Sequence, residues 1–182
     1  MRTKGSAFIL IALFPLRLTL PFSRRLNRAC SMRKSNWGGL AMTNNILSHA
    51  LQYAEAGYSV IPVNTNSKKP LIKWTPYQTK RATPEEITEW FSKWPDAGIG
   101  LVTGKISNLF VIDADTPEAI AWVESQLPES LVCPIAETPR GGRHYYFSYE
   151  GCSLTVGTQI FPGVDYRGEG GYIIAPPSSK GE

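Results

Sequence analysis

Acidic residues are absent from the first 41 positions of this 182-residue chain, although those positions contain eight lysines and arginines. Residues 42–182 therefore carry 11 basic and 15 acidic side chains, a net charge of −4, while the whole chain sums to +4. This distribution excludes a protein that coats DNA with a uniformly basic surface. Any polyanion that the folded part binds must be held by a local cluster of cations or through metal ions.

Cysteine and histidine are both scarce, with three cysteines and two histidines in the chain. Cys30, Cys133 and Cys152 are widely spaced, and none lies in a C-x-x-C or Cys/His pattern, which argues against a structural zinc site. An odd number of widely spaced cysteines is typical of reduced thiols rather than of a disulfide framework. We therefore expect a cytoplasmic protein in which Cys133 and Cys152 are small core residues.

Long hydrophobic runs are also missing. The apolar stretch AFILIALF, residues 7–14, is far too short to span a bilayer, and we expect no stable membrane partner. It has the length of the hydrophobic part of a signal peptide, and an arginine-rich leader without acids is also typical of an organelle transit peptide. A third interpretation, an upstream start codon, is favoured because MTNNILSHALQYAEAGYSVIPV from Met42 looks like a natural domain start. The chain is thus divided into a leader, 1–41, outside the fold, and one domain, 42–182.

Hydrophobic periodicity in this domain indicates helices and strands in alternation, followed by closely spaced strands. Helices are expected from Thr43 or Asn44 to about residue 56, over 83–94 with a capping box, and from Thr116 to about Leu127. Strands are expected at 58–63, 98–103, 109–114, 132–138, 143–149, 164–168 and 171–176. This order predicts an α+β fold with a mixed, largely antiparallel sheet flanked by helices.

Two aspartates end an apolar strand in LFVIDADTPEAI, residues 109–120. Asp113 and Asp115 lie two positions apart, so both carboxylates project from the same face of the strand. They are either solvated aspartates, one of which helps to cap the next helix, or ligands of a divalent cation. Mg²⁺ and Mn²⁺ are usually bound by carboxylates together with substrate phosphates, so a metal site also needs a third acid and a phosphate-binding element.

A third acid occurs in GVDYRGEGGY, residues 163–172. Asp165 lies between apolar Val164 and Tyr166 on a short strand, so it points away from both and shares its face with Arg167. The two charged residues form either a simple salt bridge or a metal ligand beside a phosphate clamp.

A candidate phosphate-binding turn occurs in ETPRGGRHYYF, residues 137–147. Arg140 and Arg143 flank Gly141 and Gly142, and consecutive glycines allow backbone N–H groups to approach an anion closely. His144 follows the turn. A plain hairpin and an ordinary strand histidine are the alternatives.

The ordered set D-x-D, T-P-R-G-G-R-H and G-V-D-Y-R-G-E-G-G-Y-I-I-A-P-P-S resembles the bifunctional DNA primase/polymerase N-terminal (Prim-Pol) domain of the archaeo-eukaryotic primase superfamily. The resemblance covers about residues 42–182 and includes AGYSVIPV, KKPLIKW and GIGLVTG. It implies a primase-polymerase fold with an RRM-like palm. It also implies a metal-dependent nucleotidyltransferase that adds nucleotides from NTP or dNTP to a 3′-hydroxyl in replication of a chromosome, plasmid or phage.

The resemblance further implies roles for single residues. Asp113, Asp115 and Asp165 match the catalytic acids that hold two Mg²⁺ or Mn²⁺ ions. His144 matches the histidine that contacts the phosphates of the incoming nucleotide. The remaining nucleotide-binding candidates are the residues of the glycine turn before His144 and the arginine after Asp165: Arg140, Gly141, Gly142, Arg143 and Arg167. Family members often have serine at the position of Arg140.

The partners implied are a nucleoside triphosphate, a single-stranded DNA template with its primer, and a replicative helicase. Family members usually continue with more of the last sheet and often with a helicase, so we expect a fragment or a stand-alone module. Two other functions stay open: a non-catalytic nucleotide- or DNA-binding replication module, and another Mg²⁺-dependent phosphotransfer enzyme or nuclease. The KKPLIKW loop carries Lys68, Lys69 and Lys73, which either contact template phosphates or are simply solvated.

Overall fold

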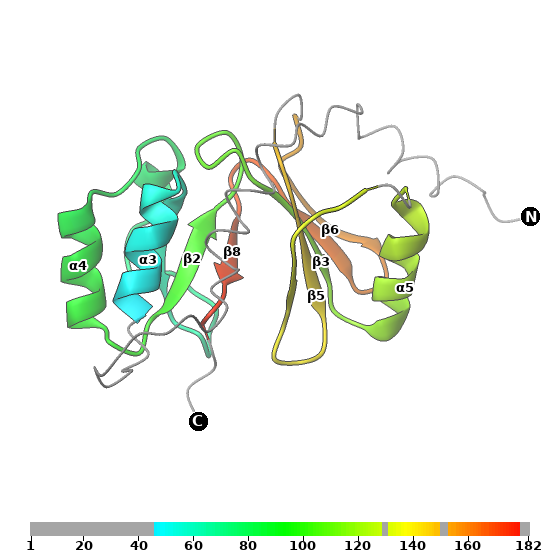
Figure 1. Ribbon diagram of the computed structural model, residues 1–182, viewed down its shortest axis with the longest axis horizontal. Helices are drawn as coiled ribbons and strands as arrows, with labels where there is room; N and C mark the ends of the chain where they lie inside the picture. Colours follow the sequence, from blue (N-terminus) through cyan, green and yellow to red (C-terminus); the bar gives the residue numbers. More distant parts are fainter. Residues whose placement is uncertain (1–45, 129–130, 150–152, 179–182) are drawn as a thin grey trace, which may run out of the picture.

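The computed structural model describes residues 46–128, 131–149 and 153–178. Its strands form a three-stranded sheet of order β1-β2-β8 and a five-stranded sheet of order β4-β5-β3-β7-β6, and every strand pair in them is antiparallel. Helices α3 and α4 lie together at one end of the molecule and α5 lies at the other, with the two sheets between them (Figure 1). The expected leader and the helix start at Thr43 or Asn44 lie outside the described residues.

The first half of the molecule is built around the three-stranded sheet. Its elements are α3 (Ile46–Glu55), β1 (Ser59–Val63), the 3-10 helix η1 (Thr75–Gln78), α4 (Pro84–Lys93), β2 (Gly98–Val102) and β8 (Tyr172–Ala175). Apolar residues of α3 and α4 form the larger core cluster with one face of this sheet. The opposite face packs against side chains of the segment between β1 and α4, including Ile72 and Trp74.

Helix α4 begins where the sequence predicts. The hydroxyl of Thr83 accepts a hydrogen bond from the backbone N–H of Glu86, and the Glu86 carboxylate accepts one from the backbone N–H of Thr83. This capping box satisfies two of the N–H groups that a helix start leaves without partners. The expected capping box is therefore confirmed.

The second half is built around the five-stranded sheet. Its elements are β3 (Phe110–Ala114), α5 (Pro117–Gln126), β4 (Ile135–Glu137), β5 (Arg143–Phe147), β6 (Val156–Phe161) and β7 (Val164–Arg167). Alternate residues of β3, Phe110, Ile112 and Ala114, pack into a core cluster with Ala119 and Val123 of α5. The residues between them, Val111 and Asp113, therefore belong to the other face of the sheet.

The chain crosses between the sheets twice, after β2 and after β7. The two crossings are bonded to each other, because the Thr103 hydroxyl donates to the Gly168 carbonyl at 2.5 Å and the Thr103 N–H donates to the Gly171 carbonyl at 2.9 Å. These bonds bring β8 beside β2 rather than beside β7. The face of the five-stranded sheet that α5 leaves uncovered is thereby placed toward β8.

The α+β fold class is confirmed, with two corrections of detail. The strands form two separate sheets rather than one mixed sheet, because the chain turns at the glycine-rich crossings. Strand β6 was not predicted. Most of its residues are exposed or half-buried without regular alternation, and Gln159 in it has a positive φ of 53°. Within the described residues, no helix is both long enough and apolar enough to cross a membrane.

Candidate active site

Three residues from the three sequence motifs form one row across the five-stranded sheet. Asp113 at the end of β3 is paired with His144 of β5 on one side and with Asp165 of β7 on the other. Residues directly opposite in an antiparallel pair have Cβ atoms about 5 Å apart and share a face of the sheet. Folding therefore brings together a D-x-D aspartate, the histidine and the third acid, which are up to 52 positions apart in the sequence.

Asp113 and His144 of this row face a cavity of about 690 Å³ that lies between the two sheets. Asp113, Asp115 and His144 line it from the five-stranded sheet. The opposite wall is the strand β8 with the residues around it, Gly170 to Ser178, whose Ile173 and Ala175 are buried. The cavity thus has a charged wall and a largely apolar wall, as is usual for sites that bind small molecules.

Asp113 is the most enclosed of the acids, with 8% of its surface exposed. Among the described residues, its buried Oδ1 has no partner at hydrogen-bond geometry, and its contact with Nε2 of His144 is 3.3 Å long. Burial alone would raise the pKa of Asp113, but His144, Arg167 and Lys68 outweigh it, so the pKa lies below the ordinary value. The carboxylate is thus held in its charged form with one oxygen unsatisfied, which is the state a cation ligand requires.

Asp115 follows the end of β3, where its N–H donates to the Gly163 carbonyl at 2.9 Å. Partial burial raises the pKa of this carboxyl, and the negative charges of Asp113 and Asp165 raise it further. A cation between the acids would offset this mutual repulsion. Thr116, not either aspartate, caps α5 by accepting from the Ala119 N–H, so capping does not explain the D-x-D pair.

Asp165 has the expected backbone position but a carboxylate that is already bound. Its Oδ2 accepts from Arg167 at 2.9 Å and its Oδ1 accepts from the backbone N–H of Gln159 at 2.8 Å. It is not among the residues that line the cavity, whereas Arg167 is. In the described part of the chain, no three His, Cys, Asp or Glu side chains are close enough to hold a metal ion together. The structure thus fits a cation at Asp113 and Asp115, with Asp165 adjacent but engaged elsewhere.

A comparison with protein families matches a segment of the chain that contains all of these residues. Residues 50–182 match the family described as bifunctional DNA primase/polymerase, N-terminal (Prim-Pol). The chain belongs to the Prim-Pol family. A search of curated proteins finds no match to this chain. Membership makes this Prim-Pol chain a domain of the DNA primase/polymerase type, which is associated with replication.

The glycine turn of this Prim-Pol domain is closed by its own hydrogen bonds. Gly141 N–H donates to the Thr138 carbonyl at 2.9 Å, and Gly142 N–H donates to the Thr138 hydroxyl at 3.0 Å. Neither amide is free for an anion, in contrast to the proposed phosphate turn. Gly142 has another use: a Cβ there would lie 2.6 Å from the Ala114 carbonyl, so only glycine lets the turn reach the end of β3. Arg140 lines the cavity and is the cation that the turn offers to it.

Arg143 is not brought into this set. It alternates with His144 along β5 and so belongs to the opposite face, where its Nη1 lies 2.8 Å from Glu124 of α5. Arg143 is also absent from the cavity lining. Its assignment to the triphosphate stays a prediction that this geometry does not support.

One cavity residue, Lys68, was not predicted from the sequence to belong to the site. Lys68, from the KKPLIKW loop, lines the cavity, and its positive charge acts on the pKa of both Asp113 and Asp115. No sequence pattern links a lysine 45 positions before Asp113 to the acids. The link depends on the placement of β8, which brings the first sheet against the second.

Proposed function

We propose that this Prim-Pol domain is a metal-dependent nucleotidyltransferase, a DNA primase/polymerase that transfers a nucleotide from NTP or dNTP to a 3′-hydroxyl. The observation that carries the proposal is the row His144–Asp113–Asp165 beside Asp115 at a cavity with one apolar wall. The buried carboxylate oxygen of Asp113 that has no hydrogen-bond partner among the described residues supports a cation site here. Two Mg²⁺ or Mn²⁺ ions, when bound, would lower the pKa of the attacking hydroxyl and neutralise the leaving pyrophosphate.

The acids would hold those ions. Asp113 and Asp115 offer carboxylate oxygens from one edge of the cavity, and Asp165 adds a third carboxylate if it leaves Arg167. Hard divalent cations bind carboxylates and phosphate oxygens together, so a triphosphate completes such a site. The acidic net charge of the domain is then no obstacle, because cations at the site neutralise both partners.

The nucleotide would be positioned by the remaining cavity residues. His144 lies beside Asp113 and offers a ring N–H to a phosphate oxygen, while Arg140 and Arg167 supply positive charge for the triphosphate. The partly exposed Tyr172, Ile174 and Pro176 on the facing wall would provide an apolar surface for the sugar and base. The protein's contribution is thus mainly orientation and electrostatic stabilisation.

A primer-extension assay with labelled dNTPs and either Mg²⁺ or Mn²⁺ tests the proposal. Extension that requires the metal supports the polymerase. Degradation of the strand would identify a nuclease, and binding without either reaction would identify a non-catalytic replication module. A single-stranded DNA template, its primer and a helicase are the partners that this function proposes.

A further inference from the structure

The segment from Asn64 to Arg81 concentrates the positive charge of the domain. It contains five lysines and arginines and no acid, although residues 42–182 have an excess of acids. Five of the ten lysines and arginines among the described residues lie in it: Lys68, Lys69, Lys73, Lys80 and Arg81. The segment links β1 to α4 and covers the face of the three-stranded sheet opposite the helices. This is a local cluster of cations on an otherwise acidic domain.

Three of these cations have no partner of opposite charge in the described part of the chain. Lys68, Lys69 and Lys73 are exposed and form no ion pair there. By contrast, Lys80 lies 4.0 Å from Glu86, and Arg81 donates two hydrogen bonds to the Ile106 carbonyl. Exposed lysines are common, so their charge alone does not identify a binding surface.

The loop that carries Lys68 is held in a defined shape. The Asn64 side-chain oxygen accepts from the N–H groups of Asn66 and Ser67, at 3.0 and 2.8 Å, and the Tyr172 hydroxyl donates to the Lys68 carbonyl at 2.7 Å. Lys68 itself has a φ of 58°, in the left-handed region that favours glycine or asparagine. The loop therefore holds Lys68 in one defined backbone conformation.

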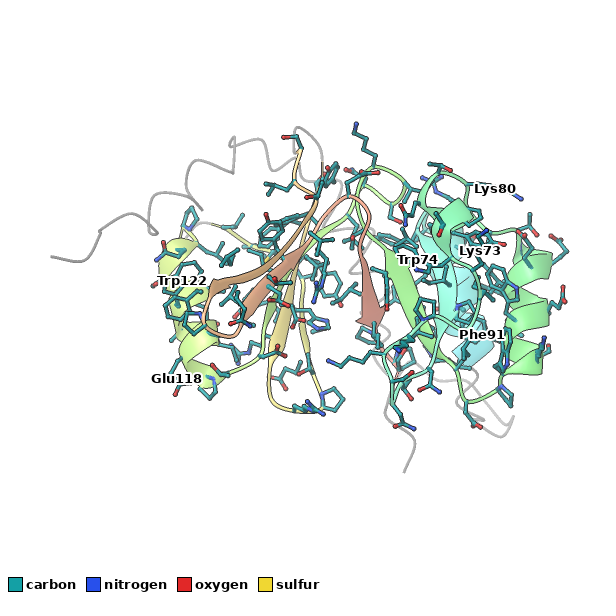
Figure 2. All side chains as sticks on the ribbon, turned by 180° about the vertical axis from the view of Figure 1, so that it is seen from behind. Lys73, Trp74, Lys80, Phe91, Glu118 and Trp122 are labelled. Atoms are coloured by element: carbon teal, nitrogen blue, oxygen red, sulfur yellow. The ribbon has the colours of Figure 1, made fainter. Side chains whose placement is uncertain are left out.

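Lys68 also connects the cluster to the acids. It lines the cavity together with Thr65, as do Asp113 and Asp115. Lys69 follows it, and Lys73 precedes the half-buried Trp74, whose ring meets Tyr172 edge-on with centroids 5.1 Å apart. Figure 2 shows Lys73, Trp74 and Lys80 on the half of the molecule built around β2, far from Glu118 and Trp122 on α5. The positive surface therefore starts at the cavity and continues away from it.

From this arrangement we propose that residues 64–81 form the surface over which a single-stranded nucleic acid leaves the cavity, with Lys68, Lys69 and Lys73 contacting its phosphates. A positive surface with an aromatic residue beside it is typical of proteins that bind single strands, and Trp74 follows Lys73 directly in this segment. The inference rests on the proposed function only in taking the cavity as the place where the strand reacts.

The test is binding of a labelled oligo(dT) of about 20 nucleotides to the full chain, measured by fluorescence anisotropy in EDTA. Each phosphate contact contributes a slope of about 0.7 in log Kd against log salt, equivalent to about fivefold in affinity at about 0.1 M salt. We expect Lys69→Gln and Lys73→Gln each to weaken binding about fivefold and to lower the slope by about 0.7. The double variant should bind about 25-fold more weakly than wild type.

Lys93→Gln is the matched control, because Lys93 is exposed on α4, on the other side of the three-stranded sheet, and carries the same charge. The basic leader contributes equally to all variants of the full chain. Equal weakening by Lys93→Gln would show a net-charge effect and overturn the inference. So would unchanged binding in the double variant, or duplex DNA that binds as tightly with the same dependence on the lysines.

The outcome is separable from the proposed function, since binding is measured without metal and extension is measured with it. If binding depends on the lysines but no nucleotide is incorporated, the single-strand surface is supported and the polymerase proposal is wrong. If nucleotides are incorporated but binding does not depend on Lys69 and Lys73, the polymerase is supported and the single-strand surface is wrong.

Discussion

Asp165 lies directly opposite Asp113 across the β3–β7 pair, yet it does not line the cavity, and both of its carboxylate oxygens are already bound, by Arg167 and by the Gln159 N–H. The backbone therefore delivers the third acid to the site while the side chain forms an ion pair. The Cβ atom of Asp165 is on the face of the sheet that carries Asp113, so another side-chain rotamer would direct the carboxylate toward Asp113. A cation held by Asp113 and Asp115, as proposed, would then compete with Arg167 for Asp165.

Replacing Arg167 with glutamine should remove this competition. We expect Arg167→Gln to bind Mn²⁺ about tenfold more tightly in the absence of nucleotide, the equivalent of one charge-assisted hydrogen bond that no longer has to be broken. Mn²⁺ titration followed by electron paramagnetic resonance measures this affinity directly. The KM for the nucleotide should rise in the same variant, since Arg167 lines the cavity.

Loss of a positive charge near the acids also favours a cation, so a second background separates the two effects. In Asp165→Asn, the Arg167→Gln substitution should give only a small gain in Mn²⁺ affinity. An equally large gain in both backgrounds would mean that Asp165 never joins the ion.

Asp113→Asn should abolish nucleotide incorporation while leaving the fold intact. Asparagine has the same shape, but it removes the charged, partly unsatisfied carboxylate on which the proposed metal site depends. We expect the rate of primer extension to fall by about a hundredfold or more. Far-UV circular dichroism should match wild type, and the rise in Tm produced by Mg²⁺ should disappear.

Asp96→Asn is the control for this prediction, because Asp96 is an exposed acid between α4 and β2 and is absent from the cavity lining. It should extend primers as wild type does. Wild-type extension by Asp113→Asn would show that the metal assignment is wrong.

Much of the site could be predicted because its residues alternate along strands. The two-residue period places Asp113 opposite to the core-facing Ile112, and it places Asp165 opposite to Val164, which is fully buried. Asp113 and Asp165 could therefore each be assigned to one face of their strand before the pairing of the strands was known. The capping box of α4 was predictable for another local reason, because its two hydrogen bonds join residues that are three positions apart.

Features that depend on long-range packing could not be predicted. The sequence places Arg143 beside the glycine turn, but only the packing of α5 on the five-stranded sheet brings Glu124 to its side chain. The separation into two sheets depends on bonds between the crossings at Thr103 and Gly168, which are 65 positions apart. The position of Lys68 at the same cavity as Asp113 and Asp115 depends on the same long-range arrangement. Local patterns carry no information about such contacts.

His144→Ala should chiefly weaken binding of the incoming nucleotide. The ring lies beside Asp113 at the cavity wall, and loss of one hydrogen bond to a charged phosphate corresponds to about a tenfold rise in KM. Steady-state kinetics with a fixed primer-template pair separates KM from kcat. His144→Gln retains an N–H donor and should recover part of the loss, whereas unchanged KM and kcat in the alanine variant would remove His144 from the site.

Gly142→Ala should impair the site through packing alone. A Cβ at this position would lie 2.6 Å from the Ala114 carbonyl and 3.1 Å from the Cα of Asp115, so the turn and the end of β3 must separate. Displacing a catalytic acid by about 1 Å can cost about a hundredfold in rate. We expect that loss in primer extension, together with a decrease of about 1–3 kcal/mol in the free energy of unfolding.

Gly100→Ala separates the two effects, because Gly100 is similarly crowded but lies in the three-stranded sheet and does not line the cavity. A Cβ there would lie 2.8 Å from Val63 and 2.9 Å from Ile61 in the core of the three-stranded sheet. It should lower the free energy of unfolding by a similar amount, measured by urea denaturation, and leave the extension rate of the folded protein unchanged. If both variants lose activity in proportion to stability, Gly142 does not position Asp115, and the close approach of the turn to β3 serves the fold alone.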